Sequence, residues 1–149
     1  MIESPGLLLT LLAFVLVIGP LVFVHEFGHY LAARVFGVKS DVFSIGFGRE
    51  VAGWTDRRGT RWKVAWLPLG GYVRFAGDMS VVSQPSADWL ALPADERQRT
   101  FQAKPVWQRA IIVAAGPVVN FVAAILILAA FAMAYGDSVT PTTVGTVLP

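Results

Sequence analysis

The chain has 149 residues, of which 55% are hydrophobic and only 15% are charged. Typical soluble domains carry about 25% charged residues, so this composition argues against a soluble domain. All 12 lysines and arginines lie between Arg34 and Arg109, together with seven acids, which gives this interval about five net positive charges. Cysteine is absent, which excludes a disulfide framework.

Residues 5–34 are predicted to form a first transmembrane helix. From Pro5 to Val24 no residue is charged, which meets the requirement of about 20 apolar residues for a helix that spans a bilayer. Gly19-Pro20 predicts a kink or a break in this helix, because proline lacks a backbone N–H and its ring clashes with the preceding turn.

The last part of this helix carries His25-Glu26-Phe27-Gly28-His29, which has the pattern HExxH. Residues i and i+4 share a helix face, so His25 and His29 can both direct a ring nitrogen to one metal ion. Glu26 lies about 100° further round the helix, where it can act as catalytic base toward a water molecule that Zn²⁺ activates. The alternative is a structural cluster of polar residues, but ionisable groups inside a membrane are expensive and by default functional.

Residues 35–104 are predicted to form a β-rich, membrane-associated loop. Asp56–Gly59 has the composition of a turn between strands at Val51–Thr55 and Thr60–Trp66, which predicts a β-hairpin or small sheet. Further on, Leu92–Phe101 is expected to contain a short surface helix within a polar loop.

The stretch Ser44-Ile45-Gly46-Phe47-Gly48 is expected to present a strand edge to substrate. Cleavage inside a transmembrane helix requires an unwound segment, and pairing with a free strand edge is one way to hold it extended. The glycines would leave room for a second backbone. The alternative is a tight turn that anchors the hairpin at the membrane surface.

Residues 105–136 are predicted to form a second transmembrane helix, since no charge occurs from Ala110 to Gly136. Asn120 within it needs a hydrogen-bond partner, either on the first helix or on a substrate backbone in the active site. Lysines and arginines mark the cytoplasmic side of a membrane. The N-terminus is therefore expected outside and residues 35–104 in the cytoplasm.

The stretch TDRRGTRWKVAW mixes arginine with tryptophan, a combination also found in nucleic-acid contacts. Anionic lipid headgroups and the positive-inside bias explain it better. The expected partner of this surface is therefore the lipid bilayer, with no nucleic acid.

Four motifs in order, HEFGH, FSIGFG, LPLGGYV and KPVWQRAIIVAAGPVVNF, resemble the site-2 protease family of intramembrane zinc metalloproteases. The similarity is strongest to the branch of the bacterial regulator of sigma-E protease (RseP-like). It implies two transmembrane helices joined by a cytoplasmic β-rich loop in a multi-pass protein of the bacterial inner membrane, with a periplasmic N-terminus. It also implies Zn²⁺ on His25 and His29, Glu26 as base, and single-span membrane proteins such as anti-sigma factors as substrates. Residues 137–149 resemble the start of a periplasmic PDZ domain.

One element of the family pattern is missing from this sequence. The family's third zinc ligand is an aspartate in a later span, within a Leu-Asp-Gly context that does not occur here. We therefore expect a fragment of a longer protease, inactive alone, whose missing C-terminal part supplies that ligand. The alternatives are a membrane protein that binds or transports metal without hydrolysis, and a non-catalytic scaffold.

Overall fold

The computed structural model describes residues 6–78, 89 and 91–136. The elements follow one another as helix α1 (Leu7–Val35), strands β1 (Ser40–Thr55) and β2 (Arg61–Phe75), short helix α2 (Ala94–Gln98) and helix α3 (Val106–Tyr135). The two long helices, the hairpin and the short helix α2 were all expected from the sequence. The proposed PDZ segment, 137–149, lies outside the described residues.

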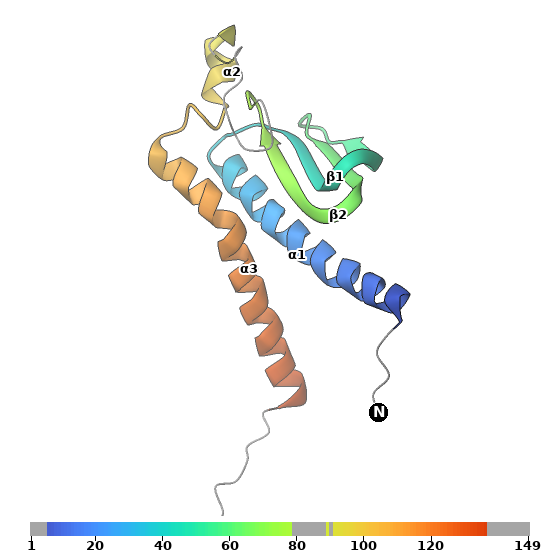
Figure 1. Ribbon diagram of the computed structural model, residues 1–149. Coiled ribbons are helices and arrows are strands. Elements are labelled where there is room, and N and C mark those ends of the chain that lie inside the picture. Colours follow the sequence, from blue (N-terminus) through green and yellow to red (C-terminus); the bar gives the residue numbers. More distant parts are fainter. Residues whose placement is uncertain (1–5, 79–88, 90, 137–149) are drawn as a thin grey trace, which may run out of the picture.

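The two long helices are close to each other at one end and run apart toward the other (Figure 1). They meet where the C-terminal part of α1 crosses the N-terminal half of α3, and His29 of α1 is within hydrogen-bonding distance of Ile112 of α3 there. The hairpin lies beside α1, and α2 lies at the same end of the molecule (Figure 1). The helix crossing and the hairpin therefore surround one region of α1.

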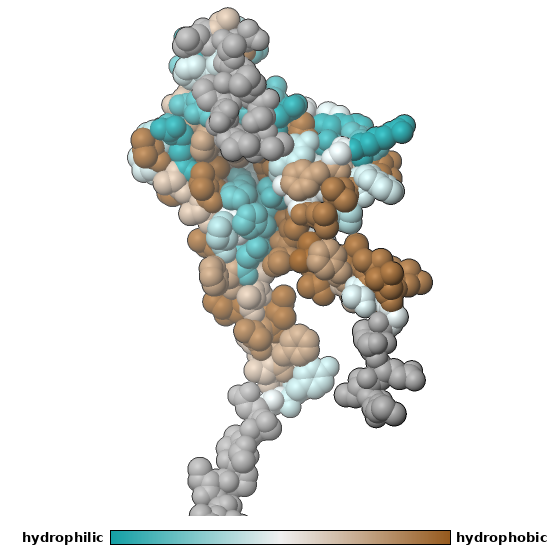
Figure 2. Space-filling model, viewed as in Figure 1, coloured by the Kyte–Doolittle hydropathy of each residue, from teal (hydrophilic) through white to brown (hydrophobic). Residues whose placement is uncertain are grey.

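Both long helices are apolar and largely exposed where they run apart. Leu7 is 77% exposed near the start of α1, and Met133 is 82% exposed near the end of α3. Figure 2 shows hydrophobic residues over these parts of the helices and hydrophilic ones over much of the opposite end. Each helix is long and apolar enough to cross a membrane. A continuous apolar surface of this kind marks a site of burial in lipid or against other protein.

Helix α1 runs without a break through Gly19 and Pro20, so of the kink or break predicted there, the break is wrong. Proline in a helix removes one backbone hydrogen bond, the one that the carbonyl of Leu16 would accept. The surrounding apolar turns continue the helix on both sides, because an unbroken helix keeps every other backbone group bonded in an apolar environment.

The hairpin packs on α1 through aromatic side chains. Phe43 is only 1% exposed and stacks on Trp62 with ring centroids 4.3 Å apart. Phe27 and Tyr30, three positions apart on α1, contact the Phe43 ring edge-on. Because residues at i and i+3 share a helix face, this pair turns one side of α1 toward the sheet. The aromatic contacts thereby fix the rotation of the helix that carries HExxH.

Strands β1 and β2 pair along more than one ladder, antiparallel near the turn and between residues 40–45 and 71–75, whereas residues 42–45 and 61–64 run in the same direction. Near the turn, residues 52–55 pair with residues 61–64 as a hairpin. Further along, residues 40–45 pair with residues 71–75, and residues 42–45 are also paired with residues 61–64. The first part of β1 therefore lies between two parts of β2. The outer edge of residues 71–75 has no strand partner among the described residues.

Asp56 organises the turn that joins the two strands. Its carboxylate accepts hydrogen bonds from the backbone N–H groups of Arg58 at 2.8 Å and Thr60 at 3.0 Å, and from the indole N–H of Trp62 at 3.0 Å. A short side chain that binds its own following backbone is the reason why aspartate favours turns. The turn predicted over Asp56–Gly59 is confirmed.

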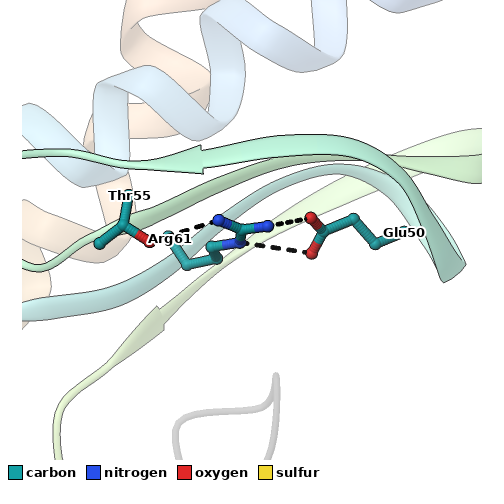
Figure 3. Close-up of polar contacts among 3 residues, drawn as sticks. All are labelled: Glu50, Thr55 and Arg61. Atoms are coloured by element: carbon teal, nitrogen blue, oxygen red, sulfur yellow. Dashed lines mark hydrogen bonds and ion pairs between the residues drawn. The ribbon is translucent and has the colours of Figure 1, made fainter.

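A second polar cluster links residues of β1 and β2 that flank the turn (Figure 3). The guanidinium of Arg61 forms an ion pair with Glu50 and donates a 3.4 Å hydrogen bond to the hydroxyl of Thr55. Both charged side chains are partly exposed, so the pair adds at most about 1 kcal/mol. Asp56 is the more important group for the hairpin.

Replacing Asp56 with Ala should loosen the hairpin, because three donors lose their acceptor at once. We expect a loss of about 1–2 kcal/mol in local stability, measured as roughly tenfold faster hydrogen exchange of the amides in residues 50–66. Asp56→Asn keeps an acceptor for the backbone N–H groups of Arg58 and Thr60 but turns an NH₂ group toward the indole N–H of Trp62, so its exchange should fall between the wild type and the alanine variant. Unchanged exchange in the alanine variant would contradict this role.

Candidate metal centre

The two histidines of HExxH face each other at the crossing of α1 and α3. Their Nε2 atoms are 3.2 Å apart, and the ring planes are inclined by 81°. Zinc binds histidine nitrogen at about 2.0–2.1 Å, which in a tetrahedral site separates two such nitrogens by about 3.3–3.4 Å. The spacing of His25 and His29 therefore fits one zinc-sized ion.

Each histidine uses its other ring nitrogen to contact α3. Nδ1 of His29 lies 2.8 Å from the carbonyl oxygen of Ile112, so its N–H donates to that backbone group. Nδ1 of His25 lies 3.2 Å from Nδ2 of Asn120. A hydrogen bond like that of His29 orients an imidazole and leaves its Nε2 free to face a metal ion. Helix α3 thus holds both rings although it contributes neither.

This arrangement requires glycine at position 116 of α3. A Cβ placed there would lie 2.9 Å from Nε2 of His25 and would overlap the ring of His29 outright. On α1, a Cβ at Gly28 would lie 2.7 Å from the carbonyl oxygen of Ala115. Small residues on both sides let two helix backbones approach closely. The crossing therefore brings α3 directly over the imidazoles.

Glu26 faces the hairpin. Its carboxyl group is hydrogen-bonded to the backbone of Val73 in β2. A Cβ at Gly71 would lie 2.9 Å from Cγ of Glu26 and 2.7 Å from the carbonyl oxygen of Ser44. The strand can approach α1 this closely only because residue 71 has no side chain. HExxH therefore has its histidines against α3 and its glutamate against the unpaired edge of β2.

Two cavities adjoin Glu26 and share Gly71 as a wall. One, of about 310 Å³, is lined by His25, Glu26 and Asn120 together with Phe47 and the Leu69–Gly71 segment. The other, of about 230 Å³, is lined by Glu26, His29, part of β2 and the start of α3. Space for a ligand thus exists on both sides of the glutamate, next to the strand edge.

The predicted strand edge at Ser44–Gly48 requires a correction. Ser44 and Ile45 have strand partners on both sides, so they do not form a free edge. A Cβ at Gly46 would collide with the carbonyls of Ala65 and Leu67, which shows that its open side is filled by β2. Gly48 has no neighbour there, and Phe47 alone of this stretch lines the cavity beside Glu26. The free edge at the site belongs to β2.

The motif LPLGGYV, which contains Gly71 and Val73, was among those that carry the family resemblance, but sequence reasoning did not assign roles to the individual residues that shape the site. Gly71 and Val73 of β2 bring the strand to Glu26, and Ile112 and Gly116 of α3 receive the histidines. The signals were present as glycines in GGYV and AAGPVV. Among the residues that the structure describes, no group of three or more His, Cys, Asp or Glu residues is arranged to hold a metal ion.

Comparison with known proteins agrees with this geometry. A family model described as Peptidase family M50 matches residues 13–147, nearly the whole chain. The chain therefore belongs to peptidase family M50, the site-2 protease family, and the resemblance found in its motifs is confirmed.

Curated relatives carry names of the same kind. "Putative zinc metalloprotease Atu1380" of Agrobacterium fabrum is 51% identical over 124 residues, which are 83% of this chain and 33% of the relative. "Metalloprotease MmpA" of Caulobacter vibrioides is 46% identical over an alignment of 152 positions, which covers 96% of this chain and 38% of the relative. The chain thus spans little more than a third of the length of these relatives.

Replacing Gly116 with Ala should disturb the crossing, because the new methyl group overlaps the His29 ring. Overpacking of this kind costs about 1–3 kcal/mol, which we expect as a lower thermal unfolding temperature in detergent. Gly19→Ala is the matched control, since a Cβ at residue 19 meets nothing within 4 Å. That change should be neutral or stabilising, because alanine favours helix over glycine by about 1 kcal/mol. Equal behaviour of the two variants would contradict the packing.

Proposed function

We propose that this chain contributes part of the active site of an intramembrane zinc metalloprotease. The observation that carries the proposal is the pair of Nε2 atoms 3.2 Å apart, with Glu26 on the same helix beside a strand edge. Two imidazoles that can hold one metal ion, a carboxylate and an edge that can bind an extended backbone are the components that metal-assisted hydrolysis of a peptide bond requires.

His25 and His29 would hold the ion, with Nδ1 of each ring bonded to α3. When bound there, zinc supplies Lewis-acid chemistry toward a peptide carbonyl and toward water. Catalytic zinc sites have three protein ligands, and the described residues offer two in the right arrangement. The third ligand is therefore proposed to come from the C-terminal part of the full-length protein, beyond this chain.

Glu26 is proposed to move the proton. It would accept a proton from the attacking water and deliver it to the nitrogen of the leaving amine, as a general base and then a general acid. The cavities on both sides of Glu26 give water and substrate access to the carboxylate.

Both long helices are proposed to span the inner membrane of a bacterium. Their exposed surfaces are apolar where they run apart, and all lysines and arginines lie from Arg34 to Arg109 (Figure 2). The positive-inside rule then assigns residues 35–104 to the cytoplasm and the N-terminus to the periplasm. HExxH would lie in the cytoplasmic half of the first span, with the hairpin next to it.

The substrate is proposed to be a single-span membrane protein, such as an anti-sigma factor, held as an added strand. A peptide bond in a transmembrane helix is protected by the hydrogen bonds of the helix. Among the described residues, the outer edge of residues 71–75 has no strand partner and lies directly beside Glu26, and β-augmentation on such an edge would keep the segment extended. Phe47 and Leu69 would contact its side chains.

Glu26→Gln in the full-length protein should abolish cleavage of a membrane substrate while zinc stays bound. The amide cannot accept the proton, whereas both imidazoles remain in place. We expect a loss of at least about 10³-fold in cleavage rate, followed by gel assay, with zinc content measured by elemental analysis. His25→Ala should lose the metal as well.

Cleavage by the glutamine variant at the wild-type rate would refute the protease. Metal binding with no chelator-sensitive cleavage by the wild type would favour a non-hydrolytic metal carrier.

Cysteine cross-linking can locate the substrate on the sheet. Leu69 and Trp54 are both 60% exposed, but Leu69 lines the cavity beside Glu26 whereas Trp54 belongs to the paired segment 52–55 next to the turn, and the chain has no cysteine of its own. In the Glu26→Gln background, Leu69→Cys should form a disulfide with a cysteine placed near the scissile bond of the substrate, and Trp54→Cys should not. Equal cross-linking from both positions would show that β2 is not the docking edge.

A further inference from the structure

Asn120 is an unusual side chain for its position. From Ala110 to Ala134 it is the only residue of α3 with an amide, hydroxyl or charged side chain. A buried amide without a full set of hydrogen bonds costs about 1–3 kcal/mol. Among the described residues, its hydrogen-bonding contact is with Nδ1 of His25. The contact with the imidazole of His25 is therefore the interaction that can explain an amide at this position.

In the structure, the Asn120 side chain is oriented so that one of its two polar atoms makes no hydrogen bond among the described residues. Nδ2 of Asn120 faces His25, and Oδ1 is buried with no hydrogen-bond partner among the described residues. In that orientation the amide donates, so Nδ1 of His25 must accept and the ring proton must sit on Nε2. A protonated Nε2 cannot bind a metal ion. This orientation is therefore incompatible with the ligand role of His25.

A half-turn of the amide removes both difficulties. The two ends of a carboxamide are nearly the same size, so exchanging Oδ1 and Nδ2 moves no other atom. Oδ1 would then accept the N–H of Nδ1, and the lone pair of Nε2 would point toward the ion. His29 already has this pattern, since its Nδ1–H donates to the carbonyl of Ile112 at 2.8 Å. Both imidazoles would then be held by an oxygen acceptor on α3.

We propose that Asn120 is a positioning residue, whose carboxamide oxygen holds His25 in the tautomer that binds the metal. This inference rests on the proposed function, because it assumes that His25 is a ligand. Of the two partners expected for Asn120, the first helix and a substrate backbone, it assigns the first helix, through the outer nitrogen of the His25 ring. Removing such an acceptor typically weakens metal binding about 10–100-fold.

The test compares Asn120→Leu with Asn120→Asp in the full-length protein reconstituted in detergent. Zinc affinity is measured by competition with a chromophoric chelator. Leucine has a similar volume but no acceptor, so we expect zinc binding at least about tenfold weaker. Aspartate keeps the acceptor oxygen and should bind zinc at least as tightly as the wild type. Ile125→Leu is the control, because residue 125 is 64% exposed on the same helix.

A second readout reports the tautomer directly. In the ¹⁵N spectrum of histidine-labelled, zinc-bound protein, the signal lost in His25→Ala belongs to His25. It should show a protonated, strongly hydrogen-bonded Nδ1 in the wild type and in Asn120→Asp. In Asn120→Leu that hydrogen bond should be missing. If the leucine variant does not fold, the wild-type and aspartate spectra still decide the question.

Three outcomes would overturn the inference. Asn120→Leu could bind zinc like the wild type but unfold at lower temperature, which would make Asn120 a helix–helix contact only. It could bind zinc normally with a raised KM, which would make it a substrate contact. Asn120→Asp could be as weak as Asn120→Leu, which would exclude an acceptor role.

These failures are distinct from a failure of the proposed function. If zinc binding depends on His25 but not on Asn120, only the positioning role is wrong. If the wild-type protein binds no zinc, or His25→Ala binds it equally well, the metal centre itself is wrong.

Discussion

The close crossing of two helices, with glycine at the point of contact, is the constraint on which the rest of the site depends. Gly116 of α3 lies over the imidazoles of His25 and His29, and Gly28 of α1 faces the backbone of Ala115. Because the helices are this close, the backbone carbonyl of Ile112 and the side-chain amide of Asn120 on α3 reach the Nδ1 atoms of the two rings. A wider crossing would separate these groups, and the imidazoles would rotate freely. The second helix therefore determines how the two imidazoles of the first are held.

The sequence predicted the elements of this fold better than their contacts. Apolar runs and the Asp56 turn have local signatures, because span length and turn chemistry are properties of consecutive residues. The supposed break at Pro20 was wrong, since one missing hydrogen bond does not end a long apolar helix. The spacing of HExxH also sufficed to predict that His25 and His29 come together. No periodicity, however, says which side of that helix meets α3.

The position of the free strand edge at the site could not be predicted from the sequence either. Ser44–Gly48 carries the glycines expected of a docking edge, but the curvature of β2 encloses Ser44 and Ile45 on both sides. The order of strand segments in a curved sheet is a long-range property, and residues 40–45 cannot reveal that residues 71–75 will be their outer neighbour. Gly71 is the position where this arrangement reaches the helix, since only glycine fits between Glu26 and Ser44.

The hydrogen bond between Glu26 and the backbone of Val73 has a consequence for timing. A polypeptide that adds itself to the outer edge of β2 needs the backbone groups of that edge, including those of Val73. It must then compete with the carboxylate for the same group. A polypeptide that binds to this edge would break the hydrogen bond between Glu26 and Val73 as it binds. Binding at this edge and release of the Glu26 carboxylate would then be a single event, and an empty edge would keep the carboxylate bonded to the strand.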